Sequence, residues 1–391
     1  MNQGVADAAA ASTESEAAAE PIVVGERVQK SYGDVDALAG VDLAVEPGEV
    51  FGLIGPNGAG KTTLVRALTG TTDVEGTVRV FDTSPTAVDA GRVGLLPQSF
   101  DPPARLTARE LVDYYGGLYD DARDTESVLA DVGMAADADA WYETLSGGQR
   151  RRTCVATAVV NDPDLLFLDE PTTGIDPAGR RALHRLIARL AADGTTVVLT
   201  SHAMDEVERL ADRVMLLRDG EVVAVGPPAA LIAEHGGRPR LEVALRDPAA
   251  ARPREGVTDG DSVATGGALA DGTAPTGGDA PDVAADVSAA VADAVEEAAV
   301  ESTTDGLRIL GIDPVEIGAV VDALADVGVE FESLTWAEPS LEDVYLRLTG
   351  ETYTSRVPSD IADASRRADG GAPPDDGPSI DDDARGDGGA R

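Results

Sequence analysis

The stretch GPNGAGKTT, residues 55–63, constrains the fold more than any other part of this chain. It matches the pattern G-x-x-x-x-G-K-[ST] between Gly55 and Thr62. An apolar, strand-like run precedes it (VFGLIG), and a helical run follows it (TTLVRALTG). A glycine-rich turn in this setting lets backbone N–H groups wrap a phosphate, and the helix dipole adds positive charge. The pattern favours a phosphate-binding loop over an ordinary glycine-rich connection.

The lysine inside this loop is unusual for the chain. Lys61 and Lys30 are its only lysines, and arginine supplies nearly every other positive charge. A compact ammonium is needed where a planar guanidinium does not fit. We therefore expect Lys61 to reach the β- and γ-phosphates of a nucleotide, and the Thr62 hydroxyl to bind Mg²⁺.

Around the loop, apolar β-type runs alternate with helical patterns from residue 21 to about residue 226, which predicts an α/β sheet domain. Residues 50–55, 165–169 and 195–201 read as buried strands. Residues 214–226 predict a hairpin that turns at Asp219-Gly220. Residues 183–190 have the spacing of an amphipathic helix that stops near Gly194.

A pair of carboxylates ends one of these strands, in LLFLDEP. We expect Asp169 to hold Mg²⁺ through a water and Glu170 to polarise the attacking water as general base. The alternative is a pair of strand-end acids that make a turn or cap a helix.

A second helix start suited to anions lies in LSGGQRRR, residues 145–152. Ser146 is a good N-cap, and Gly147 and Gly148 permit close backbone approach. One γ-phosphate in one chain hardly needs two phosphate-binding helix starts. The simplest arrangement is two chains that face head to tail, with each nucleotide between them.

Over residues 22 to about 226 the chain resembles the nucleotide-binding subunit of ABC (ATP-binding cassette) transporters. The motifs that carry this resemblance are, in chain order, GPNGAGKTT, LSGGQ, LLFLDEP and TSH. The resemblance implies a P-loop NTPase cassette of α/β class, with a RecA-like core, a β-subdomain and a helical subdomain near residues 99–150. It also implies ATP hydrolysis with Mg²⁺, and docking of the helical subdomain on a membrane permease. Residues 21–230 would form the ATPase domain.

The resemblance also assigns roles to residues. Catalysis falls to Glu170, His202 and Lys61, and Mg²⁺ binding to Thr62, Gln98 and Asp169. ATP would be bound by Tyr32, which stacks on adenine, and by Gly55, Pro56, Asn57, Gly58, Ala59, Gly60, Lys61, Thr62 and Thr63. The signature that acts on the partner chain's ATP is Leu145, Ser146, Gly147, Gly148 and Gln149, and Asp176 is the D-loop residue at the dimer interface. Tyr32 has the alternative of being an ordinary strand-edge tyrosine.

The C-terminal part narrows the resemblance. SLTWAEPSLEDVYLRLTGE resembles the end of drug- and multidrug-export ATPases that partner ABC-2 type permeases. We expect residues 240–247 and 306–350 to form a small α/β subdomain, interrupted by an acidic low-complexity insertion at 248–305, part of which has marginal helical character. Residues 1–20 and 351–391 are acidic and read as disordered.

The charge of the chain limits its partners. It has 71 acidic against 31 basic residues, a net charge of −40, which disfavours nucleic acid. This pattern resembles proteins of extreme halophiles. No apolar run is long enough to span a bilayer and no basic secretory start is present, so we expect the chain to stay in the cytoplasm. The resemblance to ABC transporter subunits implies a peripheral position on the cytoplasmic face of the membrane.

These observations predict an ATPase subunit that dimerises with a second copy or a paralogue and drives a separate permease, with export favoured. The alternatives are the ATPase of an importer, a soluble ABC protein that acts on ribosomes or DNA, and a module that only senses ATP. The resemblance implies that the transported substrate is recognised by the permease and not by this chain.

Overall fold

The structure is a computed structural model that describes residues 20–100, 102–246, 283–303 and 306–350. The predicted N-terminal lead (1–19), most of the predicted insertion (248–282) and the tail (351–391) lie outside the described residues.

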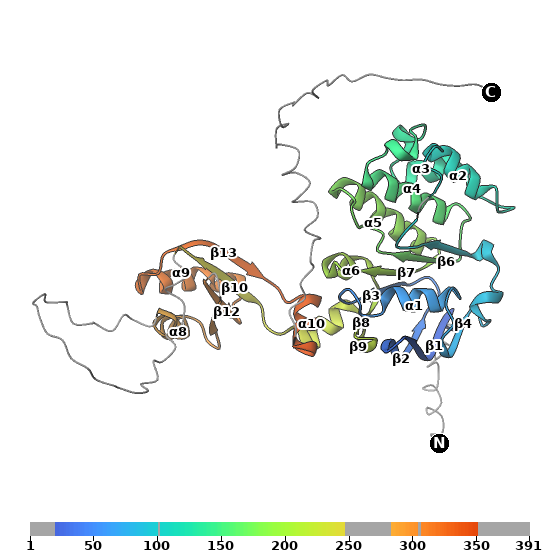
Figure 1. Ribbon diagram of the computed structural model, residues 1–391. Coiled ribbons are helices and arrows are strands. Elements are labelled where there is room, and N and C mark those ends of the chain that lie inside the picture. The colour runs from blue at the N-terminus through green and yellow to red at the C-terminus, as the bar shows by residue number, and fades with distance from the viewer. Residues whose placement is uncertain (1–19, 101, 247–282, 304–305, 351–391) are drawn as a thin grey trace, which may run out of the picture. The chain divides into compact units, whose positions relative to one another are not determined.

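A six-stranded sheet occupies the centre of the cassette (Figure 1). In spatial order its strands are β5 (Val93–Leu96), β6 (Leu165–Asp169), β7 (Thr196–Ser201), β3 (Val50–Ile54), β8 (Arg213–Arg218) and β9 (Glu221–Gly226). The first five strands are parallel, and β9 returns antiparallel to β8. The predicted strands and hairpin are confirmed. Asp219 and Gly220 have φ values of 50° and 79°, as a two-residue turn with positive φ at both central positions requires.

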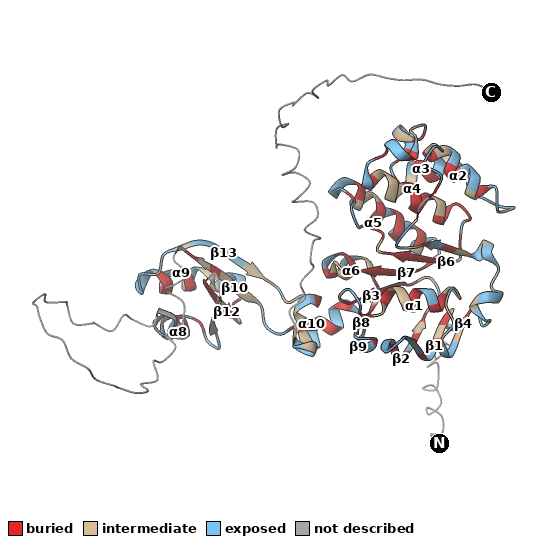
Figure 2. Cartoon of the chain, viewed as in Figure 1, coloured by how far each residue is buried: buried red, intermediate tan, exposed pale blue. Residues whose placement is uncertain are grey.

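Alternate residues of these strands fill two cores, because successive side chains point to opposite faces of a sheet. In β6, Leu166 and Leu168 pack with the helices on one face, whereas Leu165 and Phe167 pack with α1 on the other. β3, β6 and β7 are buried along their whole length (Figure 2). Both faces of the sheet are therefore covered, as expected for parallel strands.

The helices of the cassette lie on both faces of this sheet. They are α1 (Lys61–Leu68), α2 (Ala108–Gly116), α3 (Thr125–Asp131), α4 (Gly147–Val159), α5 (Pro177–Ala192), α6 (Met204–Leu210) and α7 (Pro228–Leu231). Short helical turns cover Pro85–Ala87, Ala90–Arg92, Ala135–Asp137, Tyr142–Thr144 and Ile232–Gly236. The predicted stop near Gly194 is confirmed, since α5 ends at Ala192 and Gly194 has φ of 101°. None of the helices in the described part of the chain has the length and apolar character needed to cross a bilayer.

A separate antiparallel sheet covers the α1 side of the cassette. Its strands, in spatial order, are β2 (Val35–Val45), β1 (Val23–Tyr32) and β4 (Glu75–Val80). Val23, Val28, Val41 and Val45 are fully buried in the core that α1 shares with the central sheet. This packing positions the sheet that supports the glycine-rich loop.

The C-terminal residues form a four-stranded antiparallel sheet in the order β11 (Ala299–Ser302), β12 (Gly306–Leu310), β10 (Arg240–Leu245), β13 (Phe331–Ala337). Helices α8 (Val283–Ala294) and α9 (Ile317–Asp326), the latter after a short turn at Pro314–Glu316, connect the strands in a β-α-β-β-α-β order. The prediction that residues 248–305 form an insertion is wrong for residues 283–302, because α8 and β11 belong to this unit; the marginal helix expected in this segment corresponds to α8. Val287, Val291 and Val295 recur every four residues and are buried against this sheet. The abundant alanine and aspartate around them obscured that apolar stripe in the sequence.

The last helix, α10 (Leu341–Thr349), packs on the cassette core. Ser340 caps it, with a side chain that accepts a hydrogen bond from the Asp343 N–H. Leu341, Val344 and Tyr345 are fully buried in the core cluster that holds α4, α5 and α6. The C-terminal segment that resembles the export ATPases thus ends in a helix bound to the ATPase core.

Candidate active site

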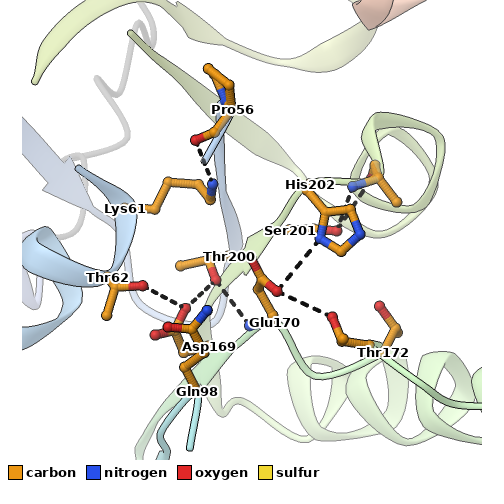
Figure 3. A network of polar contacts seen from close by, with 12 residues as sticks. Pro56, Lys61, Thr62, Gln98, Asp169, Glu170, Thr172, Thr200, Ser201 and His202 are labelled. Atoms are coloured by element: carbon orange, nitrogen blue, oxygen red, sulfur yellow. Dashed lines mark hydrogen bonds and ion pairs between the residues drawn. The ribbon is translucent and has the colours of Figure 1, made fainter. Parts of the chain in front are cut away.

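The predicted functional residues come together at one edge of the central sheet. β6, β7 and β3 are parallel neighbours, so their carboxyl ends meet there. The glycine-rich loop follows β3, Asp169 ends β6 with Glu170 directly after it, and His202 directly follows β7. Figure 3 shows these side chains converging on one volume.

The loop after β3 has the backbone that its glycines allow. Gly60 has φ of 104°, and a Cβ there would lie 2.4 Å from the Ala37 carbonyl oxygen of β2. Gly58 has φ of 89°, and a Cβ there would meet nothing within 4 Å. One side of the loop is thus tightly packed and the other is open, which fits the approach of a ligand to its backbone.

Lys61 is almost completely buried, with 5% of its surface exposed. Its Nζ donates to the Gly55 carbonyl at 2.7 Å and to the Pro56 carbonyl at 3.0 Å. Burial lowers the pKa of Lys61, and the negative charges of Glu170 and Asp169 act in the opposite direction. An ammonium has three donors, so two fix Lys61 to its own loop and one remains for a ligand.

Asp169 accepts hydrogen bonds from two hydroxyl groups. The Thr200 Oγ1 lies 2.6 Å from its Oδ1, and the Thr62 Oγ1 lies 3.4 Å from the same atom. Gln98 extends from the segment after β5 toward this carboxylate (Figure 3). Carboxylate, hydroxyl and amide oxygens are the ligands that Mg²⁺ prefers, usually alongside substrate phosphates. This donor set therefore fits the predicted Mg²⁺ site.

Glu170 has a strained backbone and a charged partner. Its φ of 50° is uncommon for a residue other than glycine. The Thr200 hydroxyl accepts from its backbone N–H at 2.9 Å, and its Oε2 lies 3.5 Å from the Nδ1 of His202. This contact lowers the pKa of Glu170 and raises the pKa of His202, each against the opposing effect of burial. The pair therefore favours an ionised carboxylate beside a protonated imidazole.

The other predicted residues lie outside this cluster of contacts. Ser146 caps α4, as predicted: its Oγ accepts from the Gln149 N–H at 3.2 Å, and the Gln149 side chain accepts from the Ser146 N–H at 2.8 Å. Asp176 caps α5 through the N–H groups of its first turn. Tyr32 ends β1 and is half exposed, at 49%, as stacking on a ligand would require.

Two residues of the site were not predicted from the sequence. Thr200 holds both the Asp169 carboxylate and the Glu170 amide. The signal was available, because Thr200 lies in the TSH string that identified His202. Arg151 donates to backbone carbonyls at the ends of β5 and β6, and only the arginine run after LSGGQ marks it in the sequence.

Comparison with known proteins identifies the family. The family model for ABC transporters matches residues 38–173. The Nod factor export ATP-binding protein I of Paraburkholderia xenovorans is 40% identical over 242 residues, which cover 60% of this chain and 80% of that protein. The chain belongs to the ABC transporter ATP-binding proteins. As an ATP-binding subunit of this family it is an ATPase.

One more similar sequence and one solved structure extend the comparison. A daunorubicin resistance ATP-binding protein of Streptomyces coeruleorubidus is 34% identical over 356 residues, covering 85% of this subunit and 97% of that protein. A solved structure described as the ATP-binding subunit of an ABC transporter superposes with a TM-score of 0.51 at 22% identity, over 55% of this chain and 93% of that one. The structural match supports a shared fold, and the predicted P-loop cassette fold is confirmed.

Proposed function

We propose that this ATP-binding subunit hydrolyses ATP between two chains arranged head to tail and thereby drives export through a separate ABC-2 type permease. One observation carries the hydrolytic part of the proposal. Lys61, Asp169, Glu170 and His202 come from three different segments of the sequence and meet at one sheet edge. At this edge the cationic groups (Lys61 and His202) and the carboxylates (Asp169 and Glu170) lie where phosphate, metal and water would have to be bound.

In this proposal the loop 55–63 wraps the phosphates, and the free donor of Lys61 binds the terminal phosphate groups. Thr62, Asp169 and Gln98 would hold Mg²⁺, which would neutralise charge on the phosphate oxygens. Glu170 orients the attacking water and accepts its proton, and His202 keeps the Glu170 carboxylate ionised and in place. Tyr32 stacks on the adenine.

The second chain completes the site. The signature, Leu145 to Gln149, includes the Ser146 cap and the first turn of α4, and this helix N-terminus presents N–H groups and a positive dipole end to the partner's γ-phosphate. Gly148 allows this turn to pack closely on the segment before Asp176, because a Cβ at Gly148 would lie 3.3 Å from the Gly174 carbonyl oxygen. We propose that Asp176 therefore lies at the dimer interface together with the signature.

Replacement of Glu170 by Gln tests the hydrolytic proposal. The amide can still contact the water but cannot accept its proton, so turnover should fall while ATP binding persists. Light scattering with Mg·ATP should then detect a dimer that forms and does not decay. The matched control is Glu221→Gln at an exposed position of β9, which should behave like the parent. Unchanged phosphate release in Glu170→Gln would refute the role of this residue as base.

Export is supported by the relatives. Nod factor export and daunorubicin resistance are the activities named for the two similar proteins. The alignment that covers 85% of this chain must extend beyond residues 21–230 into the C-terminal sheet. We propose residues 21–230 as the ATPase domain and about 99–150 as its permease-docking subdomain. We propose the C-terminal sheet with α8 and α9 as the accessory subdomain, which extends the predicted residues 240–247 and 306–350 by α8 and β11, whereas α10 packs on the ATPase core. The subunit would then bind to the membrane only through its permease.

Co-purification tests this assignment. The tagged chain, extracted with detergent from membranes of its own cell, should bring down a six-helix ABC-2 type permease. Recovery with an importer permease and a substrate-binding protein would instead support the importer alternative. A chain that never sediments with membranes would favour a soluble ABC protein.

The acidic composition supports a halophilic origin. With 71 acidic residues, mutual repulsion destabilises the chain in dilute buffer, and concentrated salt screens that repulsion. The urea midpoint should rise as KCl is added. Full stability in dilute buffer would contradict the halophile assignment.

A further inference from the structure

Arg151 lies in α4, two residues after the signature, and its guanidinium contacts the catalytic edge of the sheet. Its Nη1 donates to the carbonyls of Pro97 at 3.1 Å and Gln98 at 3.4 Å. Its Nη2 donates to the carbonyl of Glu170 at 3.0 Å and also to that of Asp169. One side chain thus binds the ends of two neighbouring strands.

The position of these carbonyls explains why an arginine is present. β5 and β6 are paired as far as Leu96 and Leu168, and the bound carbonyls come directly after that last pair. Where the hydrogen-bond ladder between β5 and β6 ends, the planar guanidinium supplies N–H donors to both strands at once. A lysine, with a single nitrogen, cannot reproduce the separated donors of this fork.

Glu170 makes this contact relevant to chemistry. A residue with a side chain held at φ of 50° is typically strained by about 1–3 kcal/mol, so neighbouring contacts must keep it there. The N–H of Glu170 is bound by Thr200, and its C=O is bound by Arg151. The two contacts fix the peptide groups on both sides of the strained Cα.

We propose that Arg151 is a positioning residue for the catalytic base: it holds the Glu170 backbone in the left-handed conformation that places the carboxylate beside His202. The inference rests on the proposed function, in which Glu170 is the base. Arg151 acts through Glu170 in this proposal, because the hydrogen bonds of its guanidinium go to backbone carbonyls.

Arg151→Met and Arg151→Lys, measured in the full chain with Mg·ATP, test the proposal. A displacement of about 1 Å in a catalytic group can lower turnover about 100-fold, so kcat of Arg151→Met should fall by about that factor. The Kd for ATP should change by less than about threefold, because the loop 55–63 is untouched. The control is Arg123→Met, which removes another partly buried arginine, one whose guanidinium pairs with Asp131 away from this edge.

The Glu170→Gln background shows whether Arg151 acts through the base. Adding Arg151→Met to Glu170→Gln should change the residual single-turnover rate by less than about twofold, since the group to be positioned is already inactive. An equal fall in kcat in both backgrounds, a fall no larger than that of Arg123→Met, or a parallel loss of ATP binding would overturn the proposal. Normal turnover in Glu170→Gln alone would instead refute the proposed function. If Arg151→Met does not fold, Arg151→Lys serves for the same comparisons and should show at least about a tenfold fall in kcat.

Discussion

Exchange of Lys61 for arginine is the sharpest test of the phosphate-binding loop, because it preserves the charge and changes only its shape. The ammonium of Lys61 is buried and donates to two loop carbonyls at 2.7 and 3.0 Å. A planar guanidinium is wider and cannot take the same position between these carbonyls and a phosphate. We expect Lys61→Arg to lose turnover although its formal charge is unchanged.

The number of Lys61 donors left for the phosphates sets the expected loss of ATP affinity. Two of its three N–H groups are committed to the loop, so the phosphates gain one charge-assisted hydrogen bond, worth about 1.5–3 kcal/mol. At the upper value, Lys61→Met should weaken ATP binding about 100-fold. ATP at 100 times the parent Kd stabilises the parent by about 2.7 kcal/mol, and the same ATP should stabilise the variant by only about 0.4 kcal/mol. For Lys61→Arg, loss of a preorganised donor should lower kcat about 100- to 1,000-fold.

Phosphate release and ATP-dependent urea unfolding measure these two effects. The chain provides its own control in Lys30, its only other lysine, whose Nζ donates to the Asp73 carbonyl at the surface. Lys30→Arg should keep turnover and ATP-dependent stabilisation within about twofold of the parent. Near-normal hydrolysis in Lys61→Arg would show that the shape of the cation does not matter. The inference that this loop needs a lysine to bind phosphate would then be refuted.

Two further predictions concern α10. Tyr345→Ala empties a fully buried site and should lower the free energy of unfolding by about 3–5 kcal/mol in urea, whereas Leu348→Ala, at 39% exposure, should change it by less than about 0.5 kcal/mol. Burial would raise the pKa of Asp343, but hydrogen bonds from Arg240 and Ser340 outweigh it and keep that pKa below its usual value. Asp343 therefore stabilises the fold at neutral pH, and this stabilisation disappears as the pH falls through its folded pKa. Urea unfolding should show Asp343→Asn less stable than the parent at pH 7 and converging with it in acid; a constant difference would contradict the assignment.

Much of the catalytic site was predictable because its residues follow local patterns. A strand end, a glycine run and a helix start are each visible in a few consecutive residues, and parallel strands bring their carboxyl ends to one edge. Lys61, Asp169 and His202 all lie in such local patterns, and Figure 3 shows them around a common volume. Their roles in ATP hydrolysis stay predictions. The roles of Tyr32, Asp176 and the signature remain predictions, because they depend on ATP and on a second chain.

The parts that escaped prediction depend on contacts between distant residues. Nothing local shows that Glu170 adopts a positive φ, since the strain is maintained by Thr200, 30 positions later, and by Arg151, 19 positions earlier. In the C-terminal sheet, α8 has an alanine- and aspartate-rich composition that matches a solvated linker as well as a helix. Its buried valines gain their meaning only from the strands against which they pack.

Lys61 and Arg151 show that the chain uses its two types of basic residue for different tasks. Arginine is used almost everywhere, and Arg151 exploits its fork to bind backbone carbonyls on two strands at once. Lys61 does what a fork cannot do: from one atom it binds two carbonyls of a tight loop and still points a donor outward. Exchanging the residue types should therefore fail in both directions, Lys61→Arg because the cation is too broad and Arg151→Lys because it is too compact. If either exchange leaves turnover intact, side-chain shape does not determine which basic residue occupies that position.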